Sequence, residues 1–432
     1  MKIKMRVSDL LPYKATRYQQ SMNAFVPGEA IVPLKQERDT TTLCVVSKGD
    51  VVKEGQVLAT SRDIKGSVIH SPVPGVVTDI GYVSGPDGRR VHAVRVRLRG
   101  EFSFYGKARR SIDWEGLPPG SLRRTIASAG VVNTFGRTVA LAHQMERLME
   151  RRTPTLVVRL FDLDPSCMVD RFIAERHPGE VMTGVAVIAA ALGTSRVLLV
   201  LPQDFDPVEP LQIPGRGVEY ITMESDTSFY PVGGKRDLMA LVGRGGRRDV
   251  RVGFRDLYID SSTAYAVYES VVQGQPMVEK FIQVSGHAIY GEGILKVRLG
   301  TPIRSLVAEL GGFVRDAGKI VVNGILMGHN VTDLDTPVTK EVKSIIVIPP
   351  RDTVSATSSE CIRCGMCRNV CPMDMAPDIL YGHYTFGREV SQGYLDTLRN
   401  CSDCVLCNAV CPARLPLCQS IKLLRGASNE KS

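Results

Sequence analysis

The sequence predicts a multidomain protein that combines α/β and α+β units. Its 432 residues are too many for one hydrophobic core and should divide into three or four domains. Short strands separated by turns fill the first hundred residues, segments of alternating helix and strand follow, and a cysteine-dense segment comes after them. A composition of 44% hydrophobic and 23% charged residues is that of an ordinary globular protein.

The cysteine-dense segment contains one motif twice. The runs CIRCGMCRNVCP (361–372) and CSDCVLCNAVCP (401–412) both read Cys-x2-Cys-x2-Cys-x3-Cys-Pro. This spacing is typical of two-cluster ferredoxins, in which three thiolates bind one [4Fe-4S] cluster and the fourth binds the other cluster. The sequence therefore predicts two [4Fe-4S] clusters with crossed ligands. Cluster one would use Cys361, Cys364, Cys367 and Cys411, and cluster two would use Cys401, Cys404, Cys407 and Cys371.

Zinc and disulfides are the alternative uses of these cysteines. Zinc sites usually show paired Cys-x2-Cys knuckles, without a third cysteine two residues further on. A disulfide framework is typical of short secreted chains, and this sequence shows no signal peptide. Outside the two runs, Cys44 and Cys167 are predicted to be small apolar fillers, and Cys418 lies where a helix would pack against a cluster. The sequence shows no catalytic residue.

Charge and hydropathy limit where the protein works. No apolar stretch is long enough to cross a bilayer, and oxygen-sensitive thiolate clusters predict a reducing compartment, the cytoplasm or a membrane's cytoplasmic face. The net charge of +9 is concentrated in arginine-rich pieces that lack interleaved aromatic residues, so nucleic-acid binding is not expected. A solvated basic face, attractive to an anionic membrane or an acidic redox partner, is the better interpretation.

The first part of the chain predicts a β module. Residues 1–29 are polar and are expected to be irregular. Between 30 and 105, Lys48-Gly-Asp-x-Val-x-x-Gly-Gln56 and Ser71-Pro-Val-x-Gly-x-Val77 are similar to the barrel-sandwich hybrid fold of lipoyl and biotinyl domains. Lys65 lies near the hairpin tip that carries the prosthetic group in such domains, but its spacing departs from the pattern, so a purely structural sandwich is expected. Alternation over 91–98 predicts an edge strand that closes the module.

The middle of the chain predicts an open α/β sheet over residues 115–275. Apolar spacing indicates helices at 138–152 and 169–192 and strands at 155–160, 196–201 and 217–223. A flavin or nucleotide would lie at the carboxyl ends of such strands. Residues 276–350 predict two hairpins around one helix, a β-grasp unit, residues 351–359 a linker, and residues 360–425 a helical ferredoxin-like domain.

From about Ala30 to Leu424 this order of units resembles RnfC, the C-subunit family of the Rnf ion-translocating electron-transport complex. Besides the eight cysteines, the most specific matches are His70-Ser-Pro-Val-Pro-Gly75, Tyr265 to Gly274, Gly300-Thr-Pro-Ile303 and Asn323 to Gly328. The family is related to cobalamin reductases and to complex I flavoprotein-type subunits. The resemblance implies a peripheral subunit on the cytoplasmic face of the inner membrane that takes electrons from NADH through FMN. Its clusters pass them to other peripheral and membrane subunits.

The chain departs from the family at the implied nucleotide site. The glycine-rich loop corresponds to Ala129–Thr138, where only Gly130 and Gly136 survive and larger side chains obstruct the approach of phosphate to backbone N–H groups. Two other motifs persist in altered form, Asp162-Leu-Asp-Pro165 and Tyr230-Pro-Val-Gly-Gly234, the latter followed by lysine in place of glutamate. The implied cofactor-binding residues are Gly130, Gly136, Asp162, Asp164, Tyr230, Gly233 and Gly234.

Two interpretations of these residues stay open. They form either a weakened FMN and NADH site or a retained scaffold of turn glycines and capping aspartates. In the second case a reduced acidic flavodoxin or ferredoxin would supply electrons directly to the clusters, a docking that the basic surface favours. The alternative function is a soluble flavin-dependent NADH reductase of the cobalamin-reductase type.

Overall fold

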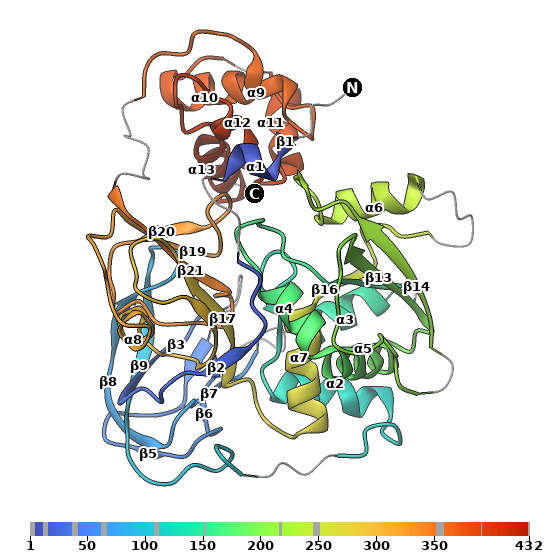
Figure 1. Cartoon of the computed structure of the whole chain (residues 1–432), viewed down its shortest axis with the longest axis vertical. Coiled ribbons are helices and arrows are strands. Elements are labelled where there is room, and N and C mark those ends of the chain that lie inside the picture. The colour runs from blue at the N-terminus through green and yellow to red at the C-terminus, as the bar shows by residue number, and fades with distance from the viewer. Residues whose placement is uncertain are drawn as a thin grey trace.

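The computed structural model describes residues 5–11, 16–36, 42–61, 67–107, 112–150, 153–215, 218–244, 251–350, 358–389 and 391–430. Two sheet-rich units and an α/β unit form the body, and a small helical unit with the cysteine runs lies at one end (Figure 1). Lys65 and most of the predicted linker 351–359 lie outside the described residues. In the part of the chain that is described, no helix is both long and apolar enough to span a membrane.

The first unit consists of two small antiparallel sheets. One has the order β3 (Glu29–Pro33), β9 (Arg90–Leu98), β8 (Gly75–Ser84), β5 (Val51–Val52), and the other β4 (Thr42–Cys44), β6 (Val57–Ser61), β7 (Ile69–His70). Their inner faces share one apolar core. The predicted edge position of 91–98 is wrong, because β9 pairs with both β3 and β8. Alternation reports which face is buried and carries no information about neighbouring strands.

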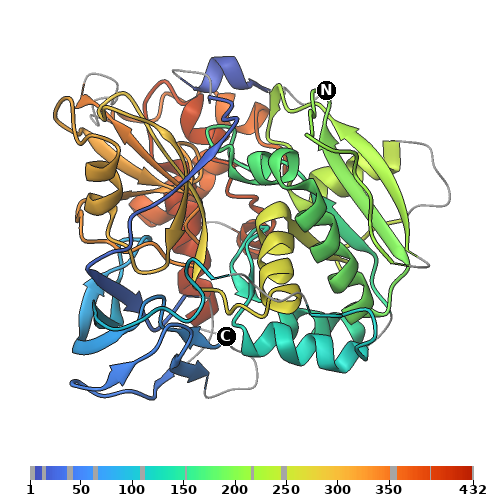
Figure 2. The ribbon, with the colours of Figure 1, turned by 60° about the horizontal axis from the view of Figure 1, so that its bottom comes forward.

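The α/β unit is built on a four-stranded parallel sheet of order β14 (Glu219–Ser225), β13 (Arg196–Pro202), β12 (Leu156–Arg159), β16 (Leu257–Asp260). Helices α2 (Pro119–Ser128), α5 (Pro178–Leu192) and α7 (Ser261–Val267) gather on one face (Figure 2). Helix α6 (Lys235–Arg244) packs on the other face against Val157 and Tyr258. Successive β12 residues alternate between the two cores, as a strand buried on both faces requires.

The predicted helix 169–192 is two helices, α4 (Val169–Arg176) and α5. Pro178 is the reason, since it occupies the first turn of α5 and disfavours helical backbone at His177, whose φ and ψ are −130° and 48°. The predicted helix 138–152 is shorter, α3 (Leu141–Met149), and follows a small hairpin of β10 (Val132–Asn133) and β11 (Val139–Ala140). After α7 the chain continues as a π-helical turn, Tyr268–Val272.

The second sheet-rich unit is a six-stranded mixed sheet. Its order is β2 (Ser21–Asn23), β18 (Gly293–Arg298), β17 (Glu279–Ser285), β21 (Ser344–Ile348), β19 (Lys319–Val322), β20 (His329–Val331), with helix α8 (Ile303–Glu309) beside it. The helix and one face of the sheet share an apolar core that includes Leu306 and Val347. Two hairpin-like strand pairs around one helix fit the predicted β-grasp arrangement, which stays a prediction.

The N-terminal segment is more ordered than its sequence predicts. Strand β2 adds to the six-stranded sheet parallel to β18, and β1 (Met5–Arg6) pairs with β15 (Phe229–Tyr230) of the α/β unit. The expectation of irregular structure through residue 29 is therefore wrong in part. These strands are held by backbone hydrogen bonds to partners that are distant in sequence. Such pairing does not require alternating apolar residues, so a short polar segment gives no sign of it.

The helical unit contains the two cysteine runs. Its elements are α9 (Met366–Asn369), α10 (Pro377–Phe386), α11 (Gln392–Asp396), the 3-10 turn Thr397–Asn400, α12 (Leu406–Ala409) and α13 (Leu417–Glu430). Helix α1 (Val7–Leu10) lies against this unit (Figure 1). Met5, Val7 and Leu10 pack with Leu406 and Val410 in one apolar cluster. The N-terminal segment thus joins the cysteine-rich unit to the body.

Candidate iron–sulfur centres

The two cysteine runs fold into loops with the same backbone pattern. Each run begins as an extended loop, turns into a four-residue helix at its third cysteine and ends at the Cys-Pro pair. Left-handed backbone occurs at matching positions, in the pairs Arg363 and Asp403, Gly365 and Val405, and Asp374 and Arg414. Such turns let three cysteines two residues apart direct their side chains to one side of the loop.

Val405 shows that this backbone is imposed on the second run. A β-branched residue at a φ of 62° is strained, whereas Gly365 adopts a φ of 74° at the same position of the first run at no steric cost. Strain of this kind persists only where surrounding structure requires it, and it gathers at functional sites. The shared loop shape is therefore a requirement of whatever the cysteines bind.

The first cavity of the helical unit is lined by Cys361, Cys364 and Cys367 from the first run and by Cys411 from the second. These four cysteines are the predicted ligands of cluster one. The Leu415 N–H donates a hydrogen bond to Cys411 Sγ over 3.5 Å. N–H···S bonds of this type stabilise electron density on sulfur and raise the reduction potential of a cluster.

The second cavity has the reciprocal composition. Cys401, Cys404 and Cys407 come from the second run and Cys371 from the first, and these are the predicted ligands of cluster two. A fifth cysteine, Cys418 on α13, lines the same cavity. Each cavity therefore offers at least four thiols from two loops, the donor set of a [4Fe-4S] cluster, and the residues fit two such groups.

The two cavities differ in their exposure. The cluster-one loop is at the surface, where Cys361 and Cys364 are exposed and Ile362 is 66% exposed. The cluster-two loop faces the α/β unit, where the Tyr230 hydroxyl donates to the Cys404 carbonyl oxygen over 2.9 Å. Cluster one would thus be accessible to a partner protein, and cluster two would lie on the inner side.

The carboxyl edge of the parallel sheet, where a flavin or nucleotide would bind, is occupied by the chain's own charged side chains. Arg159 and Asp260 end the neighbouring strands β12 and β16 and are 1% and 0% exposed. Lys343 Nζ lies 2.6 Å from both Asp170 Oδ2 and Asp260 Oδ2. Arg159 lies over the Phe135 ring, 4.3 Å from its centroid, and donates to the Gly233 carbonyl oxygen over 3.0 Å.

Burial and charge set the protonation of this network. Burial alone would raise the pKa of Asp260, but the charges of Lys343 and Arg159 outweigh it and hold the pKa below its ordinary value. Burial and the neighbouring Asp170 raise the pKa of Asp162 above its ordinary value. Lys343, despite its burial, has a raised pKa because Asp170 and Asp260 flank it. The cations and anions at this edge therefore satisfy one another.

The glycine loop is held by side chains instead of presenting free N–H groups. The Thr134 N–H donates to Thr263 Oγ1 and the Phe135 N–H to Asn133 Oδ1, both over 3.0 Å. A Cβ on Gly130 would stand 2.2 Å from the Val68 carbonyl oxygen, so this glycine permits close packing against the first unit. Gly136 has open space around it.

The other implied cofactor residues also have protein partners. Asp162 accepts from the N–H groups of Asp170 and Arg171 in the first turn of α4. Asp164 accepts from the N–H groups of Leu326 and Met327, over 2.9 and 2.8 Å. A Cβ on Gly233 would stand 2.9 Å from Arg159 Cδ, and the Gly234 N–H donates to Asp237 Oδ2. Together with Tyr230 at the cluster-two loop, these contacts support the scaffold interpretation, which stays a prediction.

Sequence reasoning missed three lysines that hold the units together. Lys340 Nζ, fully buried, donates to the carbonyl oxygens of Val68 and Gly130 over 2.9 and 2.7 Å and so joins all three units of the body. Lys280 Nζ donates to the Lys340 carbonyl oxygen, and burial lowers the pKa of Lys280 to about 7. Lys343 completes the set. Their partners are distant in sequence, so no local pattern could have identified them.

Comparison with known proteins agrees with this geometry. A family model described as the RnfC barrel sandwich hybrid domain matches residues 12–101, and one described as a 4Fe-4S dicluster domain matches residues 357–415. The C subunit of the ion-translocating oxidoreductase complex of Rhodobacter capsulatus is 27% identical over 413 residues, which are 94% of this chain and 79% of that protein. The chain is similar to RnfC over most of its length.

Other similar C subunits differ in length. The C subunit of the proton-translocating ferredoxin:NAD(+) oxidoreductase complex of Clostridium ljungdahlii is 26% identical over 361 residues, with 82% of this chain and 78% of that protein covered. The C subunit of the ion-translocating oxidoreductase complex of Yersinia enterocolitica is 27% identical over 368 residues, and the chain spans about half, 52%, of that longer protein. The sequence-based resemblance to RnfC is confirmed.

Solved structures give a weaker likeness. NAD+-reducing [NiFe]-hydrogenase in the air-oxidized state matches 65% of this chain and 53% of that chain, with a TM-score of 0.43 and 14% identity. The H2-reduced state matches 73% and 64%, with a TM-score of 0.47 and 15% identity. A likeness at this level does not bear on the assignment of cofactors.

Proposed function

We propose that this protein is a peripheral electron-transfer subunit of an Rnf-type ion-translocating membrane oxidoreductase, relaying electrons through two [4Fe-4S] clusters. The observation that carries the proposal is the reciprocal composition of the two cavities, each with three cysteines of one run and the fourth of the other. A zinc knuckle binds its ion without ligands from a second, matching run. Crossed ligands hold two clusters close together, as electron transfer between them requires. The partners are the other membrane and peripheral subunits of the complex, at the cytoplasmic face of the inner membrane.

Electrons enter at the clusters and not at a flavin. The occupied sheet edge supports this, because Arg159, Lys343 and Phe135 contact other protein groups at the carboxyl ends of the strands, where a flavin would be expected. The chain's residues at that edge bind one another and perform no chemistry on a nucleotide. The clusters, when bound, supply one-electron transfer.

Cluster one is the entry for an external donor. Its loop exposes Ile362, Arg363 and Met366, an apolar and basic combination that suits an acidic flavodoxin or ferredoxin. The cluster-two loop contacts the α/β unit through Tyr230. The direction of transfer that we propose is from the exposed cluster-one loop to cluster two.

The first test is anaerobic purification with iron, sulfide and flavin measured on the same sample. We expect about eight irons and eight sulfides per chain and no flavin, with no NADH oxidation. One flavin per chain together with NADH oxidation would refute the proposed entry and favour the cobalamin-reductase alternative. Zinc in place of iron would refute the clusters themselves.

The second test is reduction by an acidic ferredoxin, followed by stopped-flow absorbance. Arg363→Glu should slow the association rate about tenfold at low salt, because rim charges act mainly on association. Arg97→Glu, an equal charge change on the exposed face of β9, is the control and should have little effect. Equal slowing by both variants would assign the effect to net charge and remove cluster one as the entry.

A further inference from the structure

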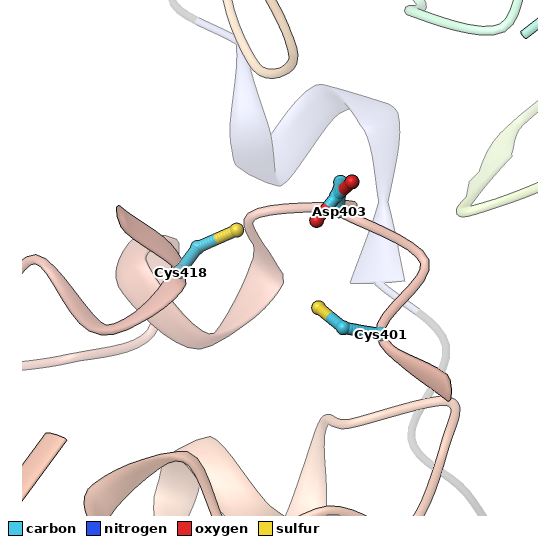
Figure 3. A group of neighbouring side chains, drawn as sticks. All are labelled: Cys401, Asp403 and Cys418. Carbon is cyan, nitrogen blue, oxygen red and sulfur yellow. The ribbon is translucent and has the colours of Figure 1, made fainter. Parts of the chain in front are cut away.

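The cluster-two cavity holds one cysteine more than a [4Fe-4S] cluster requires. Cys418 is 1% exposed and lines the cavity together with Cys371, Cys401, Cys404 and Cys407. Its sulfur lies within 4.8 Å of Cys401 Sγ. Figure 3 shows the two side chains approaching from different elements with their sulfurs directed toward the same space. A role for this extra thiol rests on the proposed clusters.

Helix α13 fixes the position of this fifth thiol. The Cys418 N–H donates to Asn408 Oδ1 over 2.8 Å, and Asn408 Nδ2 donates to Gln419 Oε1 over 2.6 Å. These bonds tie the first turn of α13 to α12, whose Cys407 is itself a predicted ligand. The thiol is therefore held at the cavity wall by the same element that positions part of the ligand set.

The other potential ligand nearby is already engaged. An Asp403 carboxylate oxygen lies within 4.8 Å of both sulfurs, but the Asp403 side chain accepts two hydrogen bonds from Arg425, over 2.6 and 2.9 Å. This ion pair directs the carboxylate toward a cation and lowers its value as an iron ligand. A soft thiolate is also the preferred ligand of an iron–sulfur cluster.

We propose that Cys418 is a reserve ligand of cluster two, able to bind the iron that Cys401 binds. In the exchange, the Cys401 sulfur–iron bond breaks and the Cys418 sulfur–iron bond forms. The Cys418 thiol gives up its proton and the released Cys401 thiolate takes one up, so charge and electron count are unchanged. Cys401 is the ligand replaced because its sulfur lies within 4.8 Å of that of Cys418; the Cys407 sulfur is a second neighbour of Cys418.

The experiment compares cysteine variants reconstituted anaerobically with iron and sulfide. Cys401→Ala should keep about eight irons and the EPR signals of two reduced [4Fe-4S] clusters, because Cys418 replaces the lost ligand. Cys401→Ala with Cys418→Ala should lose that capacity and give a three-iron EPR signal or only one cluster. The control for removal of an unrelated thiol is Cys401→Ala with Cys44→Ala, which should behave as Cys401→Ala alone.

Cys404→Ala tests whether the rescue is specific. Cys404 lies in the same cavity, and its sulfur is not part of the group formed by Cys401 and Cys418. Its loss should leave cluster two incomplete even though Cys418 is present. If Cys401→Ala loses cluster two as Cys404→Ala does, or if the double variant keeps both clusters, the proposal is overturned.

Two further controls distinguish failure of the reserve-ligand proposal from misfolding of a variant and from failure of the cluster proposal itself. Variants that do not accumulate are unfolded in urea and refolded with iron and sulfide, so that cluster content is measured on every chain. Wild-type protein without iron would refute the proposed clusters themselves. Wild-type protein with about eight irons and a Cys401→Ala variant without cluster two would refute only the reserve ligand.

Discussion

Replacing Lys343 by methionine tests whether the charged edge of the parallel sheet is a structural core. Lys343 Nζ lies 2.6 Å from one oxygen each of Asp170 and Asp260, which are almost fully buried. Methionine keeps the length and apolar character of the side chain and removes its charge. The variant leaves two buried carboxylates, with the Arg159 guanidinium, 3.8 Å from Asp170, as a neighbouring cation.

The expected loss of stability follows from this geometry. Removing one partner of a buried ion pair typically costs about 3–5 kcal/mol, because an uncompensated charge stays buried. The cost should be smaller at low pH. Without Lys343, Asp260 loses the larger of the charges that hold its pKa low, and burial then raises that pKa relative to the wild type, so the folded variant binds more protons and its loss of stability grows as pH rises.

Urea unfolding of the anaerobic protein at pH 5.5 and pH 8, followed by far-ultraviolet circular dichroism, measures both effects. Lys319→Met is the matched control, since Lys319 is exposed on β19 of the same unit, and it should change stability by no more than about 0.5 kcal/mol. A Lys343→Met loss below about 1 kcal/mol, or one that grows as pH falls, would refute the reasoning. Flavin binding by the variant would show instead that Lys343 excludes a cofactor.

Three other changes have defined outcomes. Gly130→Ala should lower the free energy of unfolding, measured by urea titration, by about 3 kcal/mol or more, because the new Cβ would lie 2.2 Å from a backbone carbonyl oxygen. Gly193→Ala is the control: Gly193 has a φ of 65° and no neighbour within 4 Å, so the loss should be only about 1 kcal/mol. Tyr230→Phe should shift the midpoint potential of cluster two and leave cluster one unchanged, since its hydroxyl bonds the Cys404 carbonyl; equal shifts in a redox titration would contradict this. Burial lowers the pKa of His70 to about 3, so the unfolded state binds a proton that the folded state does not, and stability should fall by about 2 kcal/mol from pH 7 to pH 5; His70→Asn should remove that slope.

The features predicted best from sequence are those set by short-range spacing. The two cysteine runs determine which thiols share a loop, and the matched left-handed positions near Gly365 and Val405 follow from the repeated motif. The apolar periods also located α5 and strand β12, because a segment buried on its apolar positions reports its own secondary structure. The prediction of one helix over 169–192 is wrong at His177, because Pro178 divides the continuous apolar pattern into two helices.

The sequence could predict that the nucleotide edge is obstructed, but not which side chains obstruct it. Loss of glycine from the loop indicated obstruction, but which side chains occupy the space depends on contacts across the fold. Arg159, Asp170, Asp260 and Lys343 come from four separate segments, and each one alone resembles an ordinary surface charge in the sequence. Long-range charge pairing has no period in the sequence, so the structure was needed to identify it.

The N-terminal segment has a consequence for the order of folding during synthesis. Residues 5–10 are synthesised long before their partners, which are β15 at residue 229 and the cysteine-rich unit near residue 406. Strand β2 likewise waits for β18 at residue 293. Because domains fold as they emerge and distant pairings form late, the segment can complete its docking only after residue 410 has been synthesised. Its docking on the helical unit therefore follows the synthesis of both cysteine loops.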